Sequence, residues 1–291
     1  MTPATGLGVT GGCDEAAVER AAAGKALALP RGPQRGRVGD VRSNSVGSAL
    51  ELHDFRHYHP GDDVRHLDWN AVARTGELVL RVRQDEVSPR VEVVVDATAS
   101  MAVSPEKAAR TREAAMLFCV VAQRAGLEAV LITVGQFPRR AVGHEARSAL
   151  RTLEHQGKES FAEALGRAPP LRPCGVRVLV SDLLFEASPE PLVRRLSRGA
   201  TAFFVAQVLD AEDLAPTGGA GARLTDAESG EVLERLLTSD VLQRYRDRLE
   251  AHQRLWANAI LGVQGRIATA SAEHPIDRIA GTNFAAFWEM A

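Results

Sequence analysis

Residues 91–100 of the chain read Val91-Glu92-Val93-Val94-Val95-Asp96-Ala97-Thr98-Ala99-Ser100. The nearly continuous apolar run predicts a strand buried on both faces, which is typical of a parallel sheet. Ligands bind outside the carboxyl ends of such strands, because the loops converge there and helix N-termini face the crevice. Asp96 stands at that end. It is therefore either part of a ligand site or the cap of the helix that follows.

The segments after this strand alternate between helix and strand. Ser104-Pro105-Glu106 predicts a helix start with an N-cap, a proline in the first position and an early acid, and Gly126 predicts its end. Further strands are predicted at 128–134, 176–182 and 202–208, and further helices at 145–155, 160–166 and 190–197. This alternation predicts an α/β protein with a doubly wound, mostly parallel sheet covered on both faces.

The two ends of the chain have other patterns. An Ala-rich stretch, 15–28, predicts a short helix, and Pro60-Gly61-Asp62-Asp63 predicts a turn before a strand at 77–83. Toward the C-terminus we predict a hairpin around Glu228-Ser229-Gly230, a long helix, a strand and a terminal helix. The ranges for these last three are 240–261, 267–270 and 276–290.

These patterns divide the chain into three parts. They are an N-terminal segment (1–35), a β-rich extension packed on the core (36–90) and the α/β domain with its C-terminal hairpin and helices (91–291).

Composition narrows the class of protein. The 291 residues are 45% hydrophobic and 25% charged with a formal net charge of -2, as in an ordinary globular protein without a field that would attract nucleic acid or an anionic membrane. Cys13, Cys119 and Cys174 form no CxxC pair and suggest a reducing compartment. No stretch is apolar enough to span a bilayer. We expect a cytoplasmic protein with neither a membrane span nor a nucleic-acid partner.

Oxygen-bearing side chains follow two of the predicted strands. Asp96 is followed by Thr98 and Ser100 at alternate positions, and the strand at 176–182 ends in Asp182. Carboxylate and hydroxyl oxygens are hard ligands that suit Mg²⁺, Mn²⁺ or Ca²⁺ rather than zinc. The sequence therefore predicts a divalent-cation site, with Mg²⁺ as the leading candidate and a structural polar cluster as the alternative.

This spacing resembles the metal-ion-dependent adhesion site (MIDAS) of von Willebrand factor A domains, whose usual form is Asp-x-Ser-x-Ser; Thr98 here replaces the first serine. The resemblance implies a von Willebrand factor A or Rossmann-like fold. It also implies that Ser160 and Asp182 complete the ligand set, with Thr98, Ser100 and Ser160 near the ion and the aspartates acting partly through water. One coordination position would stay open for an acidic residue of a partner.

A second resemblance is carried by residues 54–74, Asp54-Phe55-Arg56-His57-Tyr58-His59-Pro60-Gly61-Asp62-Asp63-Val64-Arg65-His66-Leu67-Asp68-Trp69-Asn70-Ala71-Val72-Ala73-Arg74. This run is similar to the signature of bacterial proteins of the DUF58 family, approximately R-x-Y-x-P-G-D-D-x-R-x-I-D-W-x-x-x-A-R, followed some twenty residues later by the adhesion-site motif. The segment 224–230 also resembles that family's late Asp-x-Glu-x-Gly segment.

The signature has two interpretations. Its arginines interleave with aspartates, which suggests charge pairs that hold the extension against the core. Alternatively it is a recognition surface, because aromatic and Arg side chains dominate interface hot spots. The candidate partner-binding residues are Arg56, Tyr58, Asp62, Asp63, Arg65, Asp68, Trp69 and Arg74.

Family resemblance implies a non-enzymatic, metal-dependent interaction module that acts as an adaptor of a MoxR-type AAA+ ATPase in chaperone-like maturation or assembly. The partner would be that ATPase, a client protein that offers an acidic residue, or both. The chain has no GxxxxGK[ST] phosphate loop, so ATP hydrolysis would belong to the partner. Two alternatives remain: a metal-dependent phosphoryl hydrolase that uses Asp96, and nucleic-acid binding through the arginines of segment 31–42.

Overall fold

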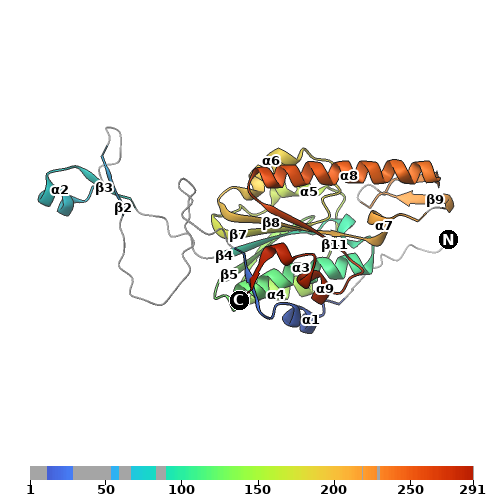
Figure 1. The fold of residues 1–291 in the computed structure, drawn as a ribbon, viewed down its shortest axis with the longest axis horizontal. Coiled ribbons are helices and arrows are strands. Elements are labelled where there is room, and N and C mark those ends of the chain that lie inside the picture. The colour runs from blue at the N-terminus through green and yellow to red at the C-terminus, as the bar shows by residue number, and fades with distance from the viewer. Residues whose placement is uncertain are drawn as a thin grey trace.

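The computed structural model describes residues 12–28, 54–58, 67–82, 90–217, 219–227 and 230–290. Figure 1 shows its helices and strands. The helices are α1 (Glu15–Ala21), α2 (Trp69–Thr75), α3 (Pro105–Arg124), α4 (His144–Arg151), α5 (Phe161–Ala164), α6 (Pro189–Ser197), α7 (Ala211–Leu214), α8 (Ser239–Gly262) and α9 (Ile276–Gly281), with short 3₁₀ helices η2 (Ala99–Ala102), η3 (Leu165–Arg167) and η4 (Ala285–Phe287). The strands are β1 (Lys25–Leu27), β2 (Asp54–His57), β3 (Val79–Val82), β4 (Arg90–Asp96), β5 (Glu128–Val134), β6 (Arg139–Val142), β7 (Cys174–Ser181), β8 (Ala200–Leu209), β9 (Gly219–Thr225), β10 (Val232–Leu237), β11 (Arg266–Ser271) and β12 (Trp288–Met290).

The central sheet has six strands in the order β11-β8-β7-β4-β5-β6. All neighbours pair in parallel except β6, which runs antiparallel to β5 at one edge. The chain builds outward from β4 through β5 to β6, and then returns to place β7, β8 and β11 on the other side. This confirms the predicted α/β class with a mostly parallel sheet, and it makes the β4–β7 neighbourhood the point where the winding direction reverses.

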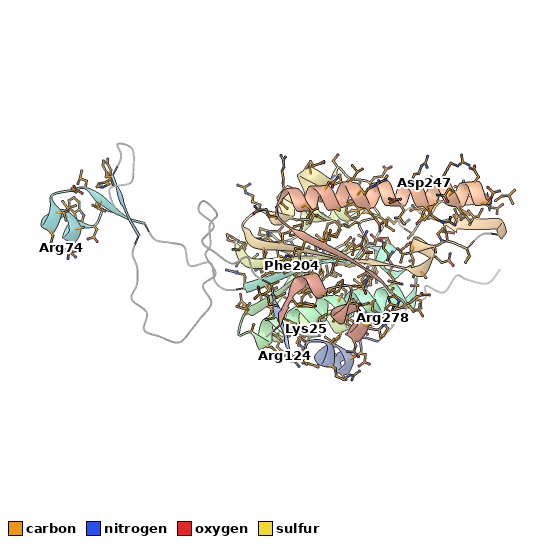
Figure 2. All side chains as sticks on the ribbon, viewed as in Figure 1. Lys25, Arg74, Arg124, Phe204, Asp247 and Arg278 are labelled. Carbon is orange, nitrogen blue, oxygen red and sulfur yellow. The ribbon has the colours of Figure 1, made fainter. Side chains whose placement is uncertain are left out.

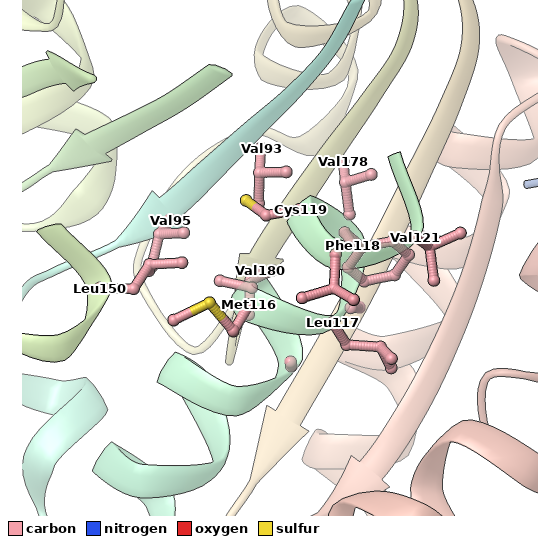
Figure 3. Close-up of a cluster of buried hydrophobic side chains, with 14 of the residues drawn as sticks. Val93, Val95, Met116, Leu117, Phe118, Cys119, Val121, Leu150, Val178 and Val180 are labelled. Atoms are coloured by element: carbon pink, nitrogen blue, oxygen red, sulfur yellow. The ribbon is translucent and has the colours of Figure 1, made fainter. Parts of the chain in front are cut away.

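Alternate residues of the strands point to opposite layers. Val93 and Val95 of β4, with Val178 and Val180 of β7, face Met116, Phe118 and Cys119 of α3 (Figure 3). The intervening Val94 and Leu179 belong to a second cluster with Phe161 and Trp256. Helices α1, α3, α4 and α9 thus cover one face, and α5, α6 and α8 cover the other (Figure 1). Burial on both faces explains why the strands are almost uninterrupted apolar runs.

Helix α3 is the central helix of its layer, and its ends follow the predicted signals. Ser104 caps it by accepting a hydrogen bond from Lys107 N at 3.1 Å, and Pro105 occupies the first position. Gly126, just past the last turn, has φ +72°, a conformation that an L side chain rarely adopts. Every residue from 113 to 122 is buried, so the helix is enclosed between the sheet and α1, α4 and α9.

The two ends of the chain meet beside α3. The helix predicted over 15–28 ends at Ala21, and β1 follows it and pairs antiparallel with β12. The terminal helix predicted over 276–290 was wrong beyond Gly281: the chain continues through η4 into β12. The reason is tertiary packing, because Phe284 and Phe287 lie with ring centroids 6.0 and 5.8 Å from Phe118. Aromatic burial outweighs the weak helical pattern of this segment.

The described part of the extension contains an antiparallel pair, β2 and β3, and the helix α2 between them in sequence. The strand predicted at 77–83 is β3, but α2 was not predicted. Its signals are present: Asp68 caps it by accepting hydrogen bonds from Asn70 N and Ala71 N, and Gly76 at φ +75° ends it. Packing of this extension on the core stays a prediction.

The C-terminal hairpin and long helix are confirmed. β9 and β10 pair antiparallel with Leu233 opposite Leu224, and residues 228–229 at the predicted turn lie outside the described part. Helix α8 follows, capped by Thr238.

Charged side chains such as Asp247 and Arg278 lie on the outside of the helical layers, whereas Phe204 lies inside (Figure 2). Among the helices described, none is long and apolar enough to cross a membrane.

A buried ion pair joins β4 to β7 near the amino end of the sheet. Both Glu92 and Arg177 have side chains with 0% exposure, and Arg177 Nη2 donates to Glu92 Oε2 at 2.8 Å. Arg177 also donates to the carbonyls of Leu196, Arg198 and Arg172. The guanidinium therefore ties α6 and the loop before β7 to the sheet.

We predict that Glu92→Ala lowers the free energy of unfolding by about 3–5 kcal/mol, because it leaves a buried guanidinium without its counter-charge. Chemical denaturation measures the effect. The matched control is Asp240→Ala in the exposed pair Asp240–Arg244, where the expected loss is at most about 0.5 kcal/mol. Equal losses in the two variants would contradict the assignment.

Candidate functional site

Two aspartates lie at the carboxyl ends of the strands that flank the reversal point: Asp96 is the last residue of β4, and Asp182 directly follows β7. β4 and β7 pair in parallel with Val95 beside Val180, so Asp96 lies next to Ser181. Ser181 Oγ donates to Asp96 Oδ2 at 2.7 Å. The two aspartates that the sequence separates by more than eighty residues therefore share one edge of the sheet, as the parallel-strand rule predicted.

The turn after β4 gathers the three oxygens of the Asp-x-Thr-x-Ser motif. Asp96 Oδ1 accepts hydrogen bonds from Thr98 N at 3.1 Å and from Thr98 Oγ1 at 2.6 Å. Thr98 Oγ1 lies 3.0 Å from Ser100 Oγ, and Ser100 stands half-buried in η2. Asp96 and Thr98 are buried, so Ser100 carries the cluster toward the surface.

Two neighbouring loops clamp this turn through the backbone of Ala97. Ala97 N donates to Val134 O at 2.7 Å, and Ala97 O accepts from Gln156 N at 3.0 Å. A Cβ on Gly135 would lie 2.8 Å from Ala97 O, so only glycine allows this approach. The position of the motif is thus fixed by the end of β5 and by the loop between α4 and α5.

Asp182 is held in a tight turn of its own. Its Oδ1 accepts from Leu184 N at 3.0 Å, and its carbonyl accepts from Gln207 Nε2 at 2.8 Å. Leu183, which lies between Asp182 and Leu184 in the sequence, has φ +59°, a left-handed conformation that costs a non-glycine residue roughly 1–2 kcal/mol. Backbone strain of this kind concentrates at functional sites, so its position beside Asp182 agrees with a site here.

Lys107 is the principal residue that sequence reasoning missed. Its Nζ lies 2.9 Å from Asp182 Oδ2 and 2.8 Å from Asp213 Oδ2, and its side chain is almost fully buried. Burial by itself would lower the pKa of Lys107, but Asp182 and Asp213 raise it above its ordinary value. One signal was available: a cation in the first turn of a helix opposes the helix dipole and so needs a partner.

The electrostatics of Asp96 differ from those of Asp182. Burial, and then the charge of Asp182, raise the pKa of Asp96 to about 7, although Thr98 and Ser181 donate hydrogen bonds to it. Hydroxyl donors thus offset only part of the cost of a buried negative charge.

The residues fit a divalent cation. The available donors are hard oxygens, and an ion would relieve the unfavourable charge on Asp96. Within the described part of the chain, no group of three or more His, Cys, Asp or Glu could hold a metal. Such an ion would therefore depend on the hydroxyls of Thr98 and Ser100.

Ser160 was predicted as a further ligand, and the structure places it at the N-cap of α5. Its Oγ accepts a weak hydrogen bond from Glu163 N, and its N donates to Glu163 Oε2 at 3.0 Å, which together form a capping box. Ser160 Oγ also donates to Glu163 Oε2 at 3.1 Å. Among the described contacts, Ser160 makes none with the other four predicted ligands. The structure therefore brings together Asp96, Thr98 and Ser100 beside Asp182, while Ser160 is occupied within its own turn.

His155 lies in the same loop that contacts Ala97. Both ring nitrogens of His155 are shielded from solvent and make no hydrogen bond of good geometry, although the main chain of Asp96 lies near enough to favour the charged imidazole. Burial, and then the charge of Arg112, lower the pKa of His155 to about 4. The imidazole is therefore neutral at physiological pH. No sequence signal distinguished it from the other histidines.

The predicted partner-binding residues are only partly described. Asp62, Asp63 and Arg65 lie outside the described residues, and only the backbone of Arg56 is described, in β2. Of the remainder, Asp68 is buried as the cap of α2, whereas Trp69 is 66% exposed. Tyr58 N donates to Leu78 O, and Arg74 Nε donates to Asn70 O. Asp68 thus has a local structural role, and Trp69 is available for contact.

The raised pKa of Asp96 gives a pH prediction for the metal-free protein. Between its ordinary value of 3.8 and about 7, the folded state keeps a proton that the unfolded state has lost. The contribution of Asp96 to the stability should therefore fall as pH rises through this window, by up to roughly 4 kcal/mol. The contribution of His155, whose pKa is lowered to about 4, rises over nearly the same window, so the slope of the wild type is the sum of two opposite contributions.

Chemical denaturation with a chelator present, across this pH range, measures the slope. Asp96→Asn should remove this contribution, and Asp240→Asn, at an exposed carboxylate, should keep the slope of the wild type. The same slope in Asp96→Asn as in the wild type would show that Asp96 is not the group responsible.

No curated protein matches the chain. Among solved structures, the conserved hypothetical protein BatB from Bacteroides thetaiotaomicron matches with a TM-score of 0.36 and 12% identity, over 68% of this chain and 98% of that chain. An aerotolerance-related membrane protein from Bacteroides fragilis NCTC 9343, with multiple mutations to serines, matches with a TM-score of 0.35 and 12% identity, over 67% and 96%.

Resemblance at that level does not determine the fold or the function of this chain. The family comparison is stronger: the model described as "Protein of unknown function DUF58" matches residues 54–255, which is more than half of the 291 residues. This range begins at the signature segment and contains both Asp96 and Asp182, so the resemblance to the DUF58 family is confirmed. The chain belongs to the DUF58 family.

Proposed function

We propose that this chain is a von Willebrand factor A-type module that binds a divalent cation, Mg²⁺ above all, and uses the ion to bind an acidic residue of a partner protein. The observation that carries the proposal is the cluster of Asp96 Oδ1, Thr98 Oγ1 and Ser100 Oγ, joined by contacts of 2.6 and 3.0 Å. The doubly wound sheet with one antiparallel edge strand supports the assignment of the fold.

The arrangement suits recognition of a carboxylate. A cation held from below by Asp96 and Thr98 would face solvent on the side of the half-buried Ser100. Hard dications take six or more oxygen ligands, so positions remain for water and for an oxygen of the partner. Ser160 would join the ligand set only by exchanging its hydrogen bond with Glu163 for the ion.

The partner follows from family resemblance. The resemblance to the DUF58 family implies that the partner is a MoxR-type AAA+ ATPase. This chain would be its non-enzymatic adaptor in the maturation or assembly of a client protein. The exposed Trp69 in the signature segment supports a recognition role for that segment, because Trp is enriched at interface hot spots.

The geometry favours a ligand role for Asp96 over a nucleophilic one. Both of its carboxylate oxygens accept hydrogen bonds, Oδ1 from Thr98 and Oδ2 from Ser181, and the residue is 0% exposed. A carboxylate that attacks a phosphorus atom needs an oxygen that the substrate can reach. The segment predicted as an alternative nucleic-acid-binding site, 31–42, lies outside the described residues.

Metal binding is tested by calorimetric titration of the full chain with Mg²⁺ and with Mn²⁺. The wild type should bind one ion, and Asp96→Ala should lose at least about a hundredfold in affinity, because even outer-shell changes cost up to that much. The control is Asp240→Ala, at an exposed carboxylate. Equal binding by the wild type and Asp96→Ala would remove the site from consideration.

Partner binding is tested with a purified MoxR-type ATPase and immobilised chain. We expect capture in the presence of Mg²⁺ and loss of capture with a chelator or in Ser100→Ala. This variant removes one hydroxyl from a half-buried position and should leave the fold intact. If capture is unchanged by the chelator and by Ser100→Ala, binding of the ATPase does not depend on the metal site.

A further inference from the structure

Lys107 contacts Asp182 beside the candidate metal site and has no part in the ligand set described above. It is the third residue of α3, and its side chain is 1% exposed. Its ammonium bridges two carboxylates from different elements: Asp182 after β7, at 2.9 Å, and Asp213 of α7, at 2.8 Å. The lysine is therefore a fixed positive charge within the layer of acids at this sheet edge.

The position is unfavourable for a lysine unless the acids are present. A cation in the first turn of a helix meets the positive end of the helix dipole. Removing an ammonium from water is also costly, and it is tolerated only when counter-charges lie close by. Because both costs are met by Asp182 and Asp213, the ammonium and the acids stabilise one another.

The same contacts restrict what Asp182 can do. Its Oδ2 accepts from Lys107 and its Oδ1 accepts from Leu184 N at 3.0 Å, so each oxygen already has a hydrogen-bond donor other than Thr98 and Ser100. Among the described contacts, Lys107 makes no hydrogen bond with Asp96, whose partners are Thr98 and Ser181. The ammonium therefore compensates Asp182 but leaves Asp96 without a cation.

We propose that Lys107 is the resident cation of this acidic cluster: it compensates Asp182 and Asp213 when no metal is bound, holds the Asp182 carboxylate back from direct coordination, and thereby weakens the site for divalent ions. The inference rests on the proposed metal binding at Asp96. Lys107 acts through Asp182 and is a positioning residue rather than a ligand.

Two consequences follow from this arrangement. The ammonium of Lys107 would repel a cation bound at Asp96, and it cannot move away without losing its contacts to Asp182 and Asp213. Metal binding should therefore be weak and reversible. The fold should also form without metal, because the cluster already contains a cation. The link extends further, since Tyr245 of α8 donates to Asp213 O at 2.7 Å. Displacement of Lys107 would therefore change the contacts of Asp213 in α7 and, through it, of Tyr245 in α8.

The test is calorimetric titration of the full chain with Mn²⁺ alone. Lys107→Met keeps the length of the side chain and removes its charge. Two controls accompany it: Lys107→Arg, which keeps the charge, and Lys25→Met, on β1, which removes a lysine that lies outside the cluster. We expect Lys107→Met to bind at least about tenfold more tightly than the wild type, and both controls to stay within about threefold of it. Equal or weaker binding by Lys107→Met overturns the inference and leaves the proposed metal site standing.

Thermal melts with a chelator test the compensating role independently of metal affinity. Lys107→Met should melt below the wild type, and adding Asp182→Asn to it should recover part of the loss, because the uncompensated charge is then gone. No recovery in the double variant contradicts the inference. If Lys107→Met does not fold on its own, adding Mn²⁺ or the Asp182→Asn substitution should restore its folding. If neither restores it, the inference is also contradicted.

A wild type that binds no Mn²⁺ refutes the proposed function. The inference then stands only if Lys107→Met does bind the ion, which would mean that the lysine takes the place of the metal. Binding by neither protein overturns both.

Discussion

The parallel pairing of β4 with β7 is the interaction on which the functional edge of this protein depends. The winding direction reverses between these strands, and in open α/β sheets ligands bind outside the carboxyl ends of the strands at such a point. The pairing also places Val95 beside Val180 and brings Asp96 to Ser181. At the other end of the same pair, the buried Glu92–Arg177 contact links β4 to β7 and anchors α6. One strand pair thus carries both a structural ion pair and an acidic cluster.

The acidic cluster shows how a fold tolerates charges that it buries. Asp182 and Asp213 share the ammonium of Lys107, whereas Asp96 has only hydroxyl and amide donors. Hydrogen bonds stabilise a buried carboxylate less than a full counter-charge does, which is why Asp96 has the raised pKa and Lys107 stays protonated. The raised pKa of Asp96 shows that its negative charge lacks the compensation that Asp182 and Asp213 receive from Lys107.

The backbone around the cluster is closely packed at Gly135 and strained at Leu183. Gly135 allows a backbone approach that no other residue would permit, and Leu183 adopts a left-handed conformation next to Asp182. Such features cost stability, and they persist only where the surrounding structure over-determines them. Leu183 is held by the bonds of Leu183 N to Ser181 Oγ and of Leu184 N to Asp182 Oδ1. The Asp-x-Thr-x-Ser turn is held separately, by the hydrogen bonds of Ala97 to Val134 and Gln156. Preorganisation of this kind lowers the entropic cost of binding.

The sequence by itself determined the features that depend on short-range chemistry. Apolar runs specified β4, β5, β7 and β8, and Ser104, Pro105 and Gly126 specified the ends of α3. The rule for parallel strands then placed Asp96 and Asp182 at one edge, while the signature segment identified the family. Each of these follows from residues within a few positions of one another or from a general property of parallel sheets.

Only the tertiary structure decided which distant side chains meet. Lys107 contacts an aspartate 75 residues away, and Ser181 donates to one 85 residues away. The terminal β12 forms a strand because β1, at the other end of the chain, offers it a pairing edge beside the aromatic cluster of α3. Local propensity contains no information about such partners, since their energies arise from burial and charge compensation that exist only once the sheet has assembled.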